Sequence, residues 1–423
     1  MIEQVLKPKN LYRALKKVEG NRGAAGVDGM KTEELAPYLD KHRASILTLI
    51  INMRYSPQAI RAVEIPKANG KTRLLGIPTV VDRWLQQAVA QALGAKFELD
   101  FEEQSYGFRP NKNLQQAASK ALGYINDGFQ DIVDIDLKGF FDEVDHAILL
   151  QLIYNRIKCP HTLRLIRKWL RAPILIEGKL HKRRKGLPQG SPLSPLLSNI
   201  MLDVLDKELS RQNLRYMRYA DDFSIYTDSK AEAKRIGNSI YLFLKKKLKL
   251  PINREKSGIR RPSNFEMLGY GFVPVYRKGV KGKYRLVPKK SSWKTLKRKL
   301  KAITKKTKPY SFRERLRLLA PIWKGWVSHY KAASIQAKLK QLDGWLRNRL
   351  RYCIWHDWKK PSKRRKSLMK LGAPEWLAGK WSYTSMGGWA VAQSPIMNTT
   401  ITLKRLKKAG YESMEEFYHQ IRH

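Results

Sequence analysis

Two adjacent acidic residues inside an otherwise apolar stretch constrain this chain most. In Arg218–Tyr226, Asp221 and Asp222 are flanked on both sides by aromatic and aliphatic residues. Such flanks predict two β-strands with the acids at the tip of the hairpin between them. Adjacent carboxylates repel each other unless a cation lies between them. The stretch is therefore either a solvated acidic turn or one part of a site for a divalent metal.

A second acidic strand favours the metal site. Acids and aliphatic residues alternate in Asp131–Leu137, which gives an extended chain one apolar face that suits a core. Asp136 is the last acid before a Lys-Gly turn, so its side chain can project from the end of the strand. Together, Asp136, Asp221 and Asp222 offer three carboxylates. These suffice for two Mg²⁺ ions about 3.5–4 Å apart once substrate phosphates supply further ligands.

The net charge of the chain predicts a polyanionic partner. The 423 residues include 84 Lys and Arg against 36 Asp and Glu, a formal net charge of +48. Such a field attracts nucleic acids with salt-dependent affinity. The 11 Trp and 19 Tyr offer surfaces on which unpaired bases can stack. The length predicts two or three domains, which distinguishes the chain from short basic proteins of the ribosomal type.

The cysteine content and the apolar runs bear on the compartment. Cys159 and Cys353 are the only cysteines, which excludes a disulfide framework and a cysteine-based zinc site and is typical of a reducing compartment. The first residues do not have the pattern of a signal peptide, and no run of about 18 apolar residues occurs. We therefore expect a cytoplasmic protein with no membrane partner.

Five motifs occur in one order along the chain, and together they carry a resemblance to a known family. They are Gly-Val-Asp-Gly at 26–29, Ser-Tyr-Gly-Phe-Arg-Pro at 105–110, Asp-x-x-x-x-Phe at 136–141, Pro-Gln-Gly at 188–190 and Tyr-Ala-Asp-Asp at 219–222. From about residue 9 to the end, the chain resembles the group II intron-encoded reverse transcriptases and maturases. Because the sequence stops at His423 without a cysteine-containing tail, it resembles a compact form that lacks the HNH endonuclease domain.

The resemblance implies an α+β fold of the right-hand polymerase type. Residues 1–60 would form an N-terminal extension and the start of the fingers, and 61–276 the fingers and a palm with an antiparallel sheet. Residues 277–360 would form a helical thumb, the maturase domain, and 361–423 a small DNA-binding region. Composition agrees with the third part, because 277–370 contain 32 Lys and Arg against 3 acids. Apolar residues at helical spacing in 293–303, 312–330 and 335–353 predict three packed helices.

The resemblance also implies roles for individual residues. The catalytic residues would be Asp136, Asp221 and Asp222, and the metal site would add Leu137 to these three. The residues that contact the nucleotide would be Lys67, Arg73, Phe141, Gln189 and Lys256. The residues that contact RNA or DNA would be Arg109, Lys297, Lys301, Arg347 and Arg351.

Each of these assignments has a plainer alternative. Lys67 and Arg73 flank an Asn-Gly turn that predicts a hairpin, where cations either bind a triphosphate or are simply solvated. Phe141 is either a wall that excludes a 2′-OH, a discrimination that packing alone can supply only to a finite degree, or a core residue. Lys256 is either a general acid for the leaving pyrophosphate or a surface lysine. Ser191 stands where many relatives carry glycine.

The glycine-rich stretch at 20–29 also has two possible interpretations. It either allows close approach of template RNA or forms plain turns. The segment Phe265–Phe272 resembles the primer-grip hairpin of the family, although its aromatic residues could equally belong to a core.

The implied activity is that of an RNA-directed DNA polymerase, a nucleotidyltransferase that extends a DNA 3′-OH on an RNA template. Two Mg²⁺ ions would activate the hydroxyl and hold the triphosphate. As a maturase, the chain would bind its group II intron RNA to assist splicing and mobility. The partners would be this RNA, an RNA template with a DNA primer, target DNA and deoxynucleoside triphosphates. Two alternatives remain open: an RNA-binding maturase that acts only in splicing, and a domesticated reverse transcriptase of bacterial defence.

Overall fold

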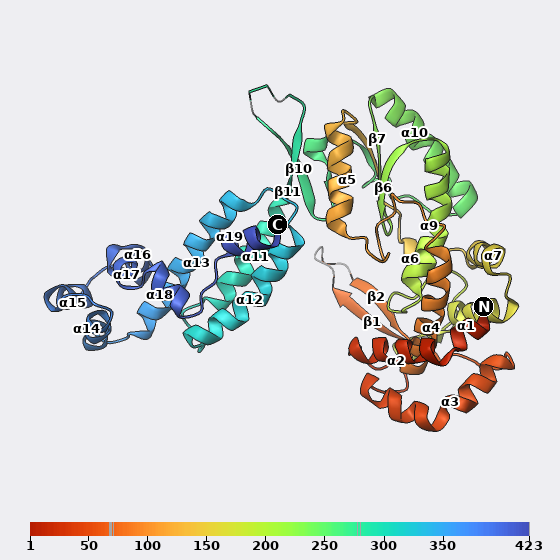
Figure 1. The fold of residues 1–423 in the computed structure, drawn as a ribbon, viewed down its shortest axis with the longest axis horizontal. Coiled ribbons are helices and arrows are strands. Elements are labelled where there is room, and N and C mark those ends of the chain that lie inside the picture. Colours follow the sequence, from red (N-terminus) through yellow and green to blue (C-terminus); the bar gives the residue numbers. More distant parts are fainter. Residues whose placement is uncertain (67–69, 71, 277, 280, 423) are drawn as a thin grey trace. The chain divides into compact units, whose positions relative to one another are not determined.

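The chain folds into two compact units, Met1–Arg261 and Pro262–His423, and each contains helices and sheet (Figure 1). The computed structural model describes residues 1–66, 70, 72–276, 278–279 and 281–422. The predicted α+β class is confirmed. The unit boundary groups the hairpin of residues 266–288 with the helices that follow it, whereas the sequence placed a boundary at 276. The four-part division into domains stays a prediction.

The helices of the first unit surround two sheets. The helices are α1 (Ile2–Leu6), α2 (Pro8–Gly20), η1 (Thr32–Glu34), α3 (Leu35–Ile51), α4 (Val80–Phe97), α5 (Leu114–Asn126), α6 (Phe140–Glu143), α7 (His146–Ile157), α8 (Pro160–Arg171), α9 (Ser194–Arg211), α10 (Lys230–Phe243) and the π-helical η2 (Leu244–Leu248). The strands are β1 (Ile60–Pro66), β2 (Thr72–Ile77), β3 (Asp131–Ile135), β4 (Ile174–Ile176), β5 (Lys179–His181), β6 (Arg215–Tyr219), β7 (Asp222–Thr227) and β8 (Gly258–Arg260).

The central sheet has the strand order β6-β7-β3-β8, and all of its neighbours are antiparallel. Its register pairs Tyr219 with Asp222 across the β6–β7 turn and Ile135 with Phe223 across β3–β7. Ala220 in the turn has a φ of 56°, the left-handed conformation that a two-residue hairpin turn requires. Helix α10 packs on β3 and β7, and α5 packs on β6. The acidic hairpin predicted from the sequence is therefore confirmed. The neighbouring strand β3 contains Asp131 and Asp134 and is followed directly by Asp136.

A second sheet has the order β2-β1-β4-β5. Strands β1 and β2 form the hairpin that the Asn-Gly turn predicted, with Ile65 opposite Arg73 and Pro66 opposite Thr72. Strand β4 joins β1 in parallel through two residue pairs only. The N–H of Gly76 in β2 donates to the Gln189 carbonyl at 2.9 Å, which ties this sheet to the loop of residues 188–190.

The second unit combines a three-stranded sheet with nine helices among its described residues. The sheet order is β11-β10-β9, made of β9 (Glu266–Met267), β10 (Tyr270–Pro274) and β11 (Tyr284–Pro288), after the short η3 (Pro262–Asn264). The helices are α11 (Lys290–Ile303), α12 (Phe312–His329), α13 (Gln336–Asp357), α14 (Pro361–Lys370), α15 (Glu375–Ser382), α16 (Gly388–Gln393), α17 (Pro395–Thr400), α18 (Leu403–Lys408) and α19 (Met414–Arg422).

The three helices that the apolar spacing predicted are α11, α12 and α13, and their apolar stripes are buried or partly buried. The end of the chain returns to this bundle. Asp343 of α13 is buried and accepts hydrogen bonds from the hydroxyls of Tyr411 and Ser413 and from two N–H groups at the start of α19. Helix α19 consequently packs on both α12 and α13. No described helix has the length and apolar character needed to cross a bilayer.

Candidate active site and its supports

The three acids predicted to act together come from neighbouring strands of the central sheet. Asp221 and Asp222 lie at the β6–β7 turn, and Asp136 follows the last residue of β3. The backbone of Asp136 is fixed on two sides, since its N–H donates to the Ser257 hydroxyl at 3.0 Å and its carbonyl accepts from the Asn253 N–H at 2.8 Å. Strand pairing between β3 and β7 therefore brings both acidic segments to one end of the sheet.

The carboxylates lie close enough to perturb one another. Burial raises the pKa of the Asp222 carboxyl to about 6, with further contributions from the charges of Asp221, Asp136 and Asp134. Burial also raises the pKa of Asp221, and the nearby guanidinium of Arg73 opposes this rise. Both side chains at the turn keep some access to solvent, so the excess negative charge stays within reach of an incoming ion. Such a cluster favours the binding of a cation.

The donor set fits a hard divalent ion, because carboxylate oxygens are the ligands that such ions prefer. Among the residues that the structure describes, no three His, Cys, Asp or Glu side chains already converge as the ligands of one ion. A metal bound here would therefore draw further oxygen ligands from elsewhere, as substrate phosphates can supply. Leucine has no polar side-chain atom, so Leu137 can offer an ion only its backbone carbonyl.

Four of the predicted site residues line one cleft of about 920 Å³. They are Arg73 from β2, Phe141 from α6, Gln189 from the Pro-Gln-Gly loop and Asp221 from the acidic turn. The ring of Phe141 packs against that of Phe140 at 5.3 Å between centroids and is only partly buried. Phe141 thus lines the cleft and also packs against the hydrophobic core. Lys67 lies outside the described residues.

The Pro-Gln-Gly loop is held against both neighbouring elements. A Cβ on Gly190 would come within 2.5 Å of the Gly76 carbonyl oxygen, and a Cβ on Gly186 within 2.9 Å of two carbonyls of α6. Both glycines also have positive φ, which favours glycine. The Ser191 hydroxyl donates to the Gln86 side chain of α4 at 2.9 Å. Ser191 therefore fastens the loop to α4 through a contact that glycine at this position could not make.

Lys256 is exposed, and its Nζ lies 3.7 Å from the nearer Asp136 carboxylate oxygen. At this distance and exposure the pair is weak, so the ammonium group remains available to a third group. Lys256 therefore lies next to Asp136 and is not among the residues that line the cleft.

A buried arginine that the sequence analysis missed fixes the acidic turn. The Arg218 side chain is fully buried and pairs with the Asp206 carboxylate of α9, which is also fully buried. Its remaining N–H groups donate to the Ala220 carbonyl at 2.9 Å, to the Ser105 hydroxyl at 2.7 Å and to the Asn199 side-chain oxygen at 3.1 Å. One guanidinium group thereby connects the turn to α9 and to the loop before α5.

The Ser-Tyr-Gly-Phe-Arg-Pro block packs directly on the same turn. The Tyr106 N–H donates to the Arg218 carbonyl at 2.8 Å, and the Gly107 carbonyl accepts from the Asn199 amide at 2.9 Å. A Cβ on Gly107 would lie 2.2 Å from the Ala220 nitrogen, so a side chain there would displace the turn. The block therefore positions the two acids, and glycine is required by close approach.

Arg109, predicted to contact nucleic acid, is engaged within the chain, and its contact with nucleic acid stays a prediction. The Arg109 side chain is only 7% exposed and forms an ion pair with Glu98 at 2.8 Å. It also donates to the backbone carbonyls of Glu102 and Ser105. Because its N–H groups are engaged within the chain, Arg109 holds the loop that carries the block.

The glycine-rich stretch before α3 also packs on its own chain. A Cβ on Gly23 would lie 2.6 Å from the Arg83 guanidinium, and one on Gly26 would lie 2.7 Å from the backbone of Thr79. Arg83 donates to the Ala24 carbonyl at 2.7 Å. These glycines let the stretch approach the start of α4, which explains them without an RNA contact. Gly23 still lines the cleft.

The four cations predicted on the helical unit differ in their surroundings. Lys297 and Lys301 are exposed on α11, with the Lys297 ammonium 5.1 Å from the Trp345 ring centroid. Arg347 of α13 is half-buried. Arg351 is 7% exposed and donates through two nitrogens to the Ile401 carbonyl, and its contact with RNA or DNA stays a prediction. It joins α13 to the segment after α17.

Comparison with known proteins decides the family. Residues 65–272 match the family described as reverse transcriptase (RNA-dependent DNA polymerase), and residues 293–372 match the group II intron maturase-specific domain. The chain belongs to the group II intron-encoded reverse transcriptases. These are RNA-directed DNA polymerases that carry a maturase domain, so the predicted family, enzyme class and maturase character are confirmed.

Individual relatives of this reverse transcriptase are moderately similar. Protein YkfC of Escherichia coli K12 is 29% identical over 314 residues, which cover 64% of this chain and 82% of YkfC. Group II intron-encoded protein LtrA of Lactococcus lactis is 30% identical over 342 residues, which cover 65% of this chain and 57% of LtrA. A partial Cas6-RT-Cas1–Cas2 complex is similar over 57% of this chain and 42% of its own, at 23% identity and a TM-score of 0.36.

Proposed function

We propose that this reverse transcriptase extends the 3′-OH of a DNA primer on an RNA template, with Asp136, Asp221 and Asp222 as its catalytic carboxylates. The observation that carries the proposal is that these acids lie at one end of the central sheet, where their charges act on one another, beside the cleft that Arg73 and Phe141 line. The ions they bind are Mg²⁺, with the Leu137 carbonyl as a further ligand. When bound, such ions lower the pKa of the attacking hydroxyl and neutralise charge on the transferred phosphate.

The other cleft residues act on the nucleotide. Arg73 lies at the cleft and carries a charge suited to a triphosphate, and the same role for Lys67 rests on the family resemblance. Gln189 contacts the incoming nucleotide from its loop, while Phe141 forms the wall beside the sugar. Lys256, next to Asp136, donates the proton that the leaving pyrophosphate requires.

A primer-extension assay tests this polymerase site. The wild-type chain is supplied with an RNA template, a DNA primer and deoxynucleoside triphosphates, with and without Mg²⁺. Extension should require Mg²⁺ and should be lost in Asp136→Asn. The matched control is Asp131→Asn at the other end of β3, where the carboxylate pairs with Arg261 at 3.0 Å. Equal extension by both variants would contradict the assignment of Asp136.

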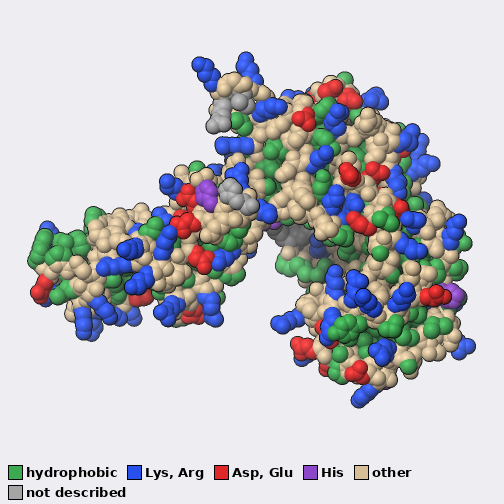
Figure 2. All heavy atoms as spheres, in the orientation of Figure 1, with side chains coloured by type: hydrophobic (Ala, Val, Ile, Leu, Met, Phe, Trp, Pro, Cys, Tyr) green, Lys and Arg blue, Asp and Glu red, His purple; other side chains and the backbone are tan. Residues whose placement is uncertain are grey.

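A second function rests on the helical unit. We propose that the exposed basic face of α11, which includes Lys297 and Lys301, binds intron RNA and supports its splicing and mobility. Its support is the match of residues 293–372 to the maturase-specific domain together with the excess of cations there. Figure 2 shows Lys and Arg spread over the visible surface of both units, with fewer Asp and Glu. Target DNA would be contacted by the helices after residue 361.

Splicing measured beside extension separates the alternatives. A chain that acts only in splicing would bind intron RNA and fail to extend a primer. A reverse transcriptase of bacterial defence would extend a primer and leave the splicing of a flanking intron unchanged. Under our proposal, Asp136→Asn removes extension and leaves splicing intact, whereas Lys297→Gln/Lys301→Gln impairs splicing at low Mg²⁺.

A further inference from the structure

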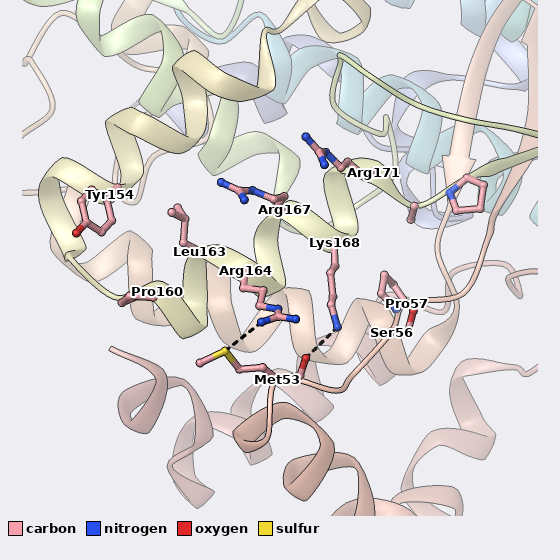
Figure 3. A pocket seen from close by; sticks show the side chains of 12 residues that line it. Met53, Ser56, Pro57, Tyr154, Pro160, Leu163, Arg164, Arg167, Lys168 and Arg171 are labelled. Carbon is pink, nitrogen blue, oxygen red and sulfur yellow. Dashed lines mark hydrogen bonds between the residues drawn. The ribbon is translucent and has the colours of Figure 1, made fainter.

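Helix α8 of the first unit carries a stripe of cations that the polymerase site does not use. Arg164, Arg167, Lys168 and Arg171 recur at spacings of three and four residues, and the opposite face of the helix is buried through Leu165, Ile166, Trp169 and Leu170. Figure 3 shows Arg164 and Lys168 reaching toward the Met53 segment, whereas Arg167 and Arg171 extend away from it. The helix contains no Asp or Glu. Like charges at these spacings repel each other, so an anion from outside the helix would relieve the repulsion among the exposed arginines of the stripe.

These cations border a groove of about 700 Å³, the α8 groove. Its other wall is the segment of Met53, Ser56 and Pro57, and its floor includes Leu163 and Pro173. Lys168 is engaged with this wall, since its ammonium donates to the backbone carbonyls of Met53 and Tyr55. Lys168 thus ties α8 to this segment, and the three arginines also line the groove (Figure 3).

The three arginines lack anionic partners among the described residues. Arg164, Arg167 and Arg171 are exposed, and no described Asp or Glu lies within ion-pair distance of them. Arg164 makes one weak contact, to the Met53 sulfur at 3.7 Å. The lining of the groove includes no acidic side chain among the residues that the structure describes. The groove therefore presents guanidinium donors whose counter-charge must come from outside the chain.

The basic surface continues beyond the end of α8. Arg171 and Pro173 also line a neighbouring cavity of about 760 Å³ together with Lys182, Arg183 and Arg184. The Arg183 guanidinium donates one N–H to the Gly186 carbonyl at 3.0 Å, while its other terminal nitrogen is buried without a partner among the described residues. The two cavities thus form one continuous cationic track.

An aromatic residue completes the α8 groove. Tyr154 of α7 lines it and is 41% exposed, so its ring is accessible from the groove. Unpaired bases stack on such rings, and guanidinium groups bind phosphates through paired N–H donors. The stripe from Arg164 to Arg171 rises about 10 Å along the helix axis, which matches the span of a few phosphates of one strand.

We propose that the α8 groove is a binding site for single-stranded RNA, distinct from the cleft at the acidic cluster. The cleft and the groove share no lining residue among those described. The phosphates lie along Arg164, Arg167 and Arg171 and continue toward Lys182 and Arg184, and a base stacks on Tyr154. The exposed ring favours RNA over an acidic protein segment, because carboxylates would use the arginines and leave the ring unused. RNA binding at this groove does not require polymerase activity.

The salt dependence of RNA binding tests this site in the full chain. The probe is a single-stranded oligoribonucleotide without secondary structure, titrated by fluorescence anisotropy over a range of salt concentrations. For a single strand, the removal of one cation that binds a phosphate reduces the slope of log K against log salt by about 0.7. The slope of the variant Arg164→Gln/Arg167→Gln/Arg171→Gln should therefore be smaller by about 2.

The matched control removes the same charge elsewhere on the first unit. Lys41→Gln/Arg43→Gln/Lys245→Gln replaces three exposed cations outside both cavities, and its slope should stay at the wild-type value. Both triple variants should keep the wild-type Tm, since only exposed side chains change. An equal reduction of the slope in both would show that net charge alone matters and would overturn the site.

Cross-linking locates the RNA independently of affinity. With 4-thiouridine in the probe, the wild-type chain should yield cross-linked peptides that contain Tyr154, and Tyr154→Leu should remove them without changing the slope. Absence of cross-links in α7 and α8 in the wild type would overturn the proposal. Unlabelled RNA should compete with these cross-links better than an acidic peptide of matched charge, and stronger competition by the peptide would assign the groove to an acidic protein instead.

Discussion

Replacing Arg218 with methionine should separate the geometry of the acidic turn from the acids themselves. The buried pair with Asp206 would lose one partner, and loss of one member of a buried ion pair costs about 3–5 kcal/mol because the other charge stays uncompensated. The Ala220 carbonyl and the Ser105 hydroxyl would lose their bonds to the guanidinium as well. For a domain of roughly 250 residues, each kcal/mol lowers Tm by about 2–4 °C, so a loss of roughly 6–20 °C is expected.

The second variant, Arg218→Met/Asp206→Leu, removes both charges. Apolar replacement of a buried pair is often neutral for stability, so most of the decrease in Tm should be reversed. Primer extension should not return, since nothing would connect the Ala220 carbonyl to α9. Compared with Arg218→Met, the double variant should therefore recover thermal stability and should not recover primer extension.

The assay compares thermal unfolding and primer extension for both variants. Arg211→Met is the control. Arg211 pairs with Glu208 on the exposed side of α9, the helix that carries Asp206, so its replacement should leave Tm and extension unchanged. If Arg218→Met unfolded at the same temperature as the control, the buried network would not have the role described. Full extension by the double variant would refute the claim that Arg218 positions the acidic turn.

The remaining predictions concern the cleft wall, the helical unit and one buried histidine. Phe141→Val should raise the ratio of ribonucleotide to deoxynucleotide incorporation by ~10-fold or more, and an unchanged ratio would return Phe141 to a purely core role. Lys297→Gln/Lys301→Gln should lower the salt slope of intron RNA binding by about 1 to 2 without a change in Tm, and a full wild-type slope would exclude these lysines from the RNA surface. Burial lowers the pKa of His146, which contacts the Gly186 carbonyl at 2.8 Å. Stability from the neutral ring should therefore be present above pH 6.5 and fall as the pH drops below it, and a Tm that fell equally in His146→Gln would contradict this source.

The sequence was sufficient for features that depend on local periodicity. The alternation in Asp131–Leu137 and the apolar flanks of Asp221 and Asp222 predicted the strands and the acidic turn correctly, because strand faces repeat every two residues. The three helices of the second unit followed from apolar spacing for the same kind of reason. The Asn-Gly turn between β1 and β2 was equally local.

Contacts between distant residues could not be read in this way. Arg218 donates a hydrogen bond to Ser105, which lies 113 positions earlier in the sequence, and no periodicity connects the two residues. One signal did exist, since Arg218 lies between apolar and aromatic residues directly before two acids, and an arginine there must be either exposed or paired with a buried acid. Arg109 and Arg351 illustrate the same limit, because the sequence does not show that their guanidinium groups donate to backbone carbonyls within the chain.

The glycines of the family motifs illustrate the same limit. Gly107 is needed because the backbone of the acidic turn approaches it, and Gly190 because the Gly76 carbonyl does. Sequence shows only that a side chain is absent, whereas the reason is a neighbour that folding brings in. The cleft that joins Arg73 to Asp221 likewise exists only after two sheets and α9 have packed.

The most direct test of the polymerase site is primer extension by Asp221→Asn, measured beside its affinity for the same RNA template. The substitution keeps the size of the side chain and removes one of the charges that raise the pKa of Asp222. We expect extension of a DNA primer on RNA to be abolished while RNA affinity and Tm stay at the wild-type values. Extension at the wild-type rate by a folded, RNA-binding Asp221→Asn protein would show that the acidic turn is not the catalytic centre.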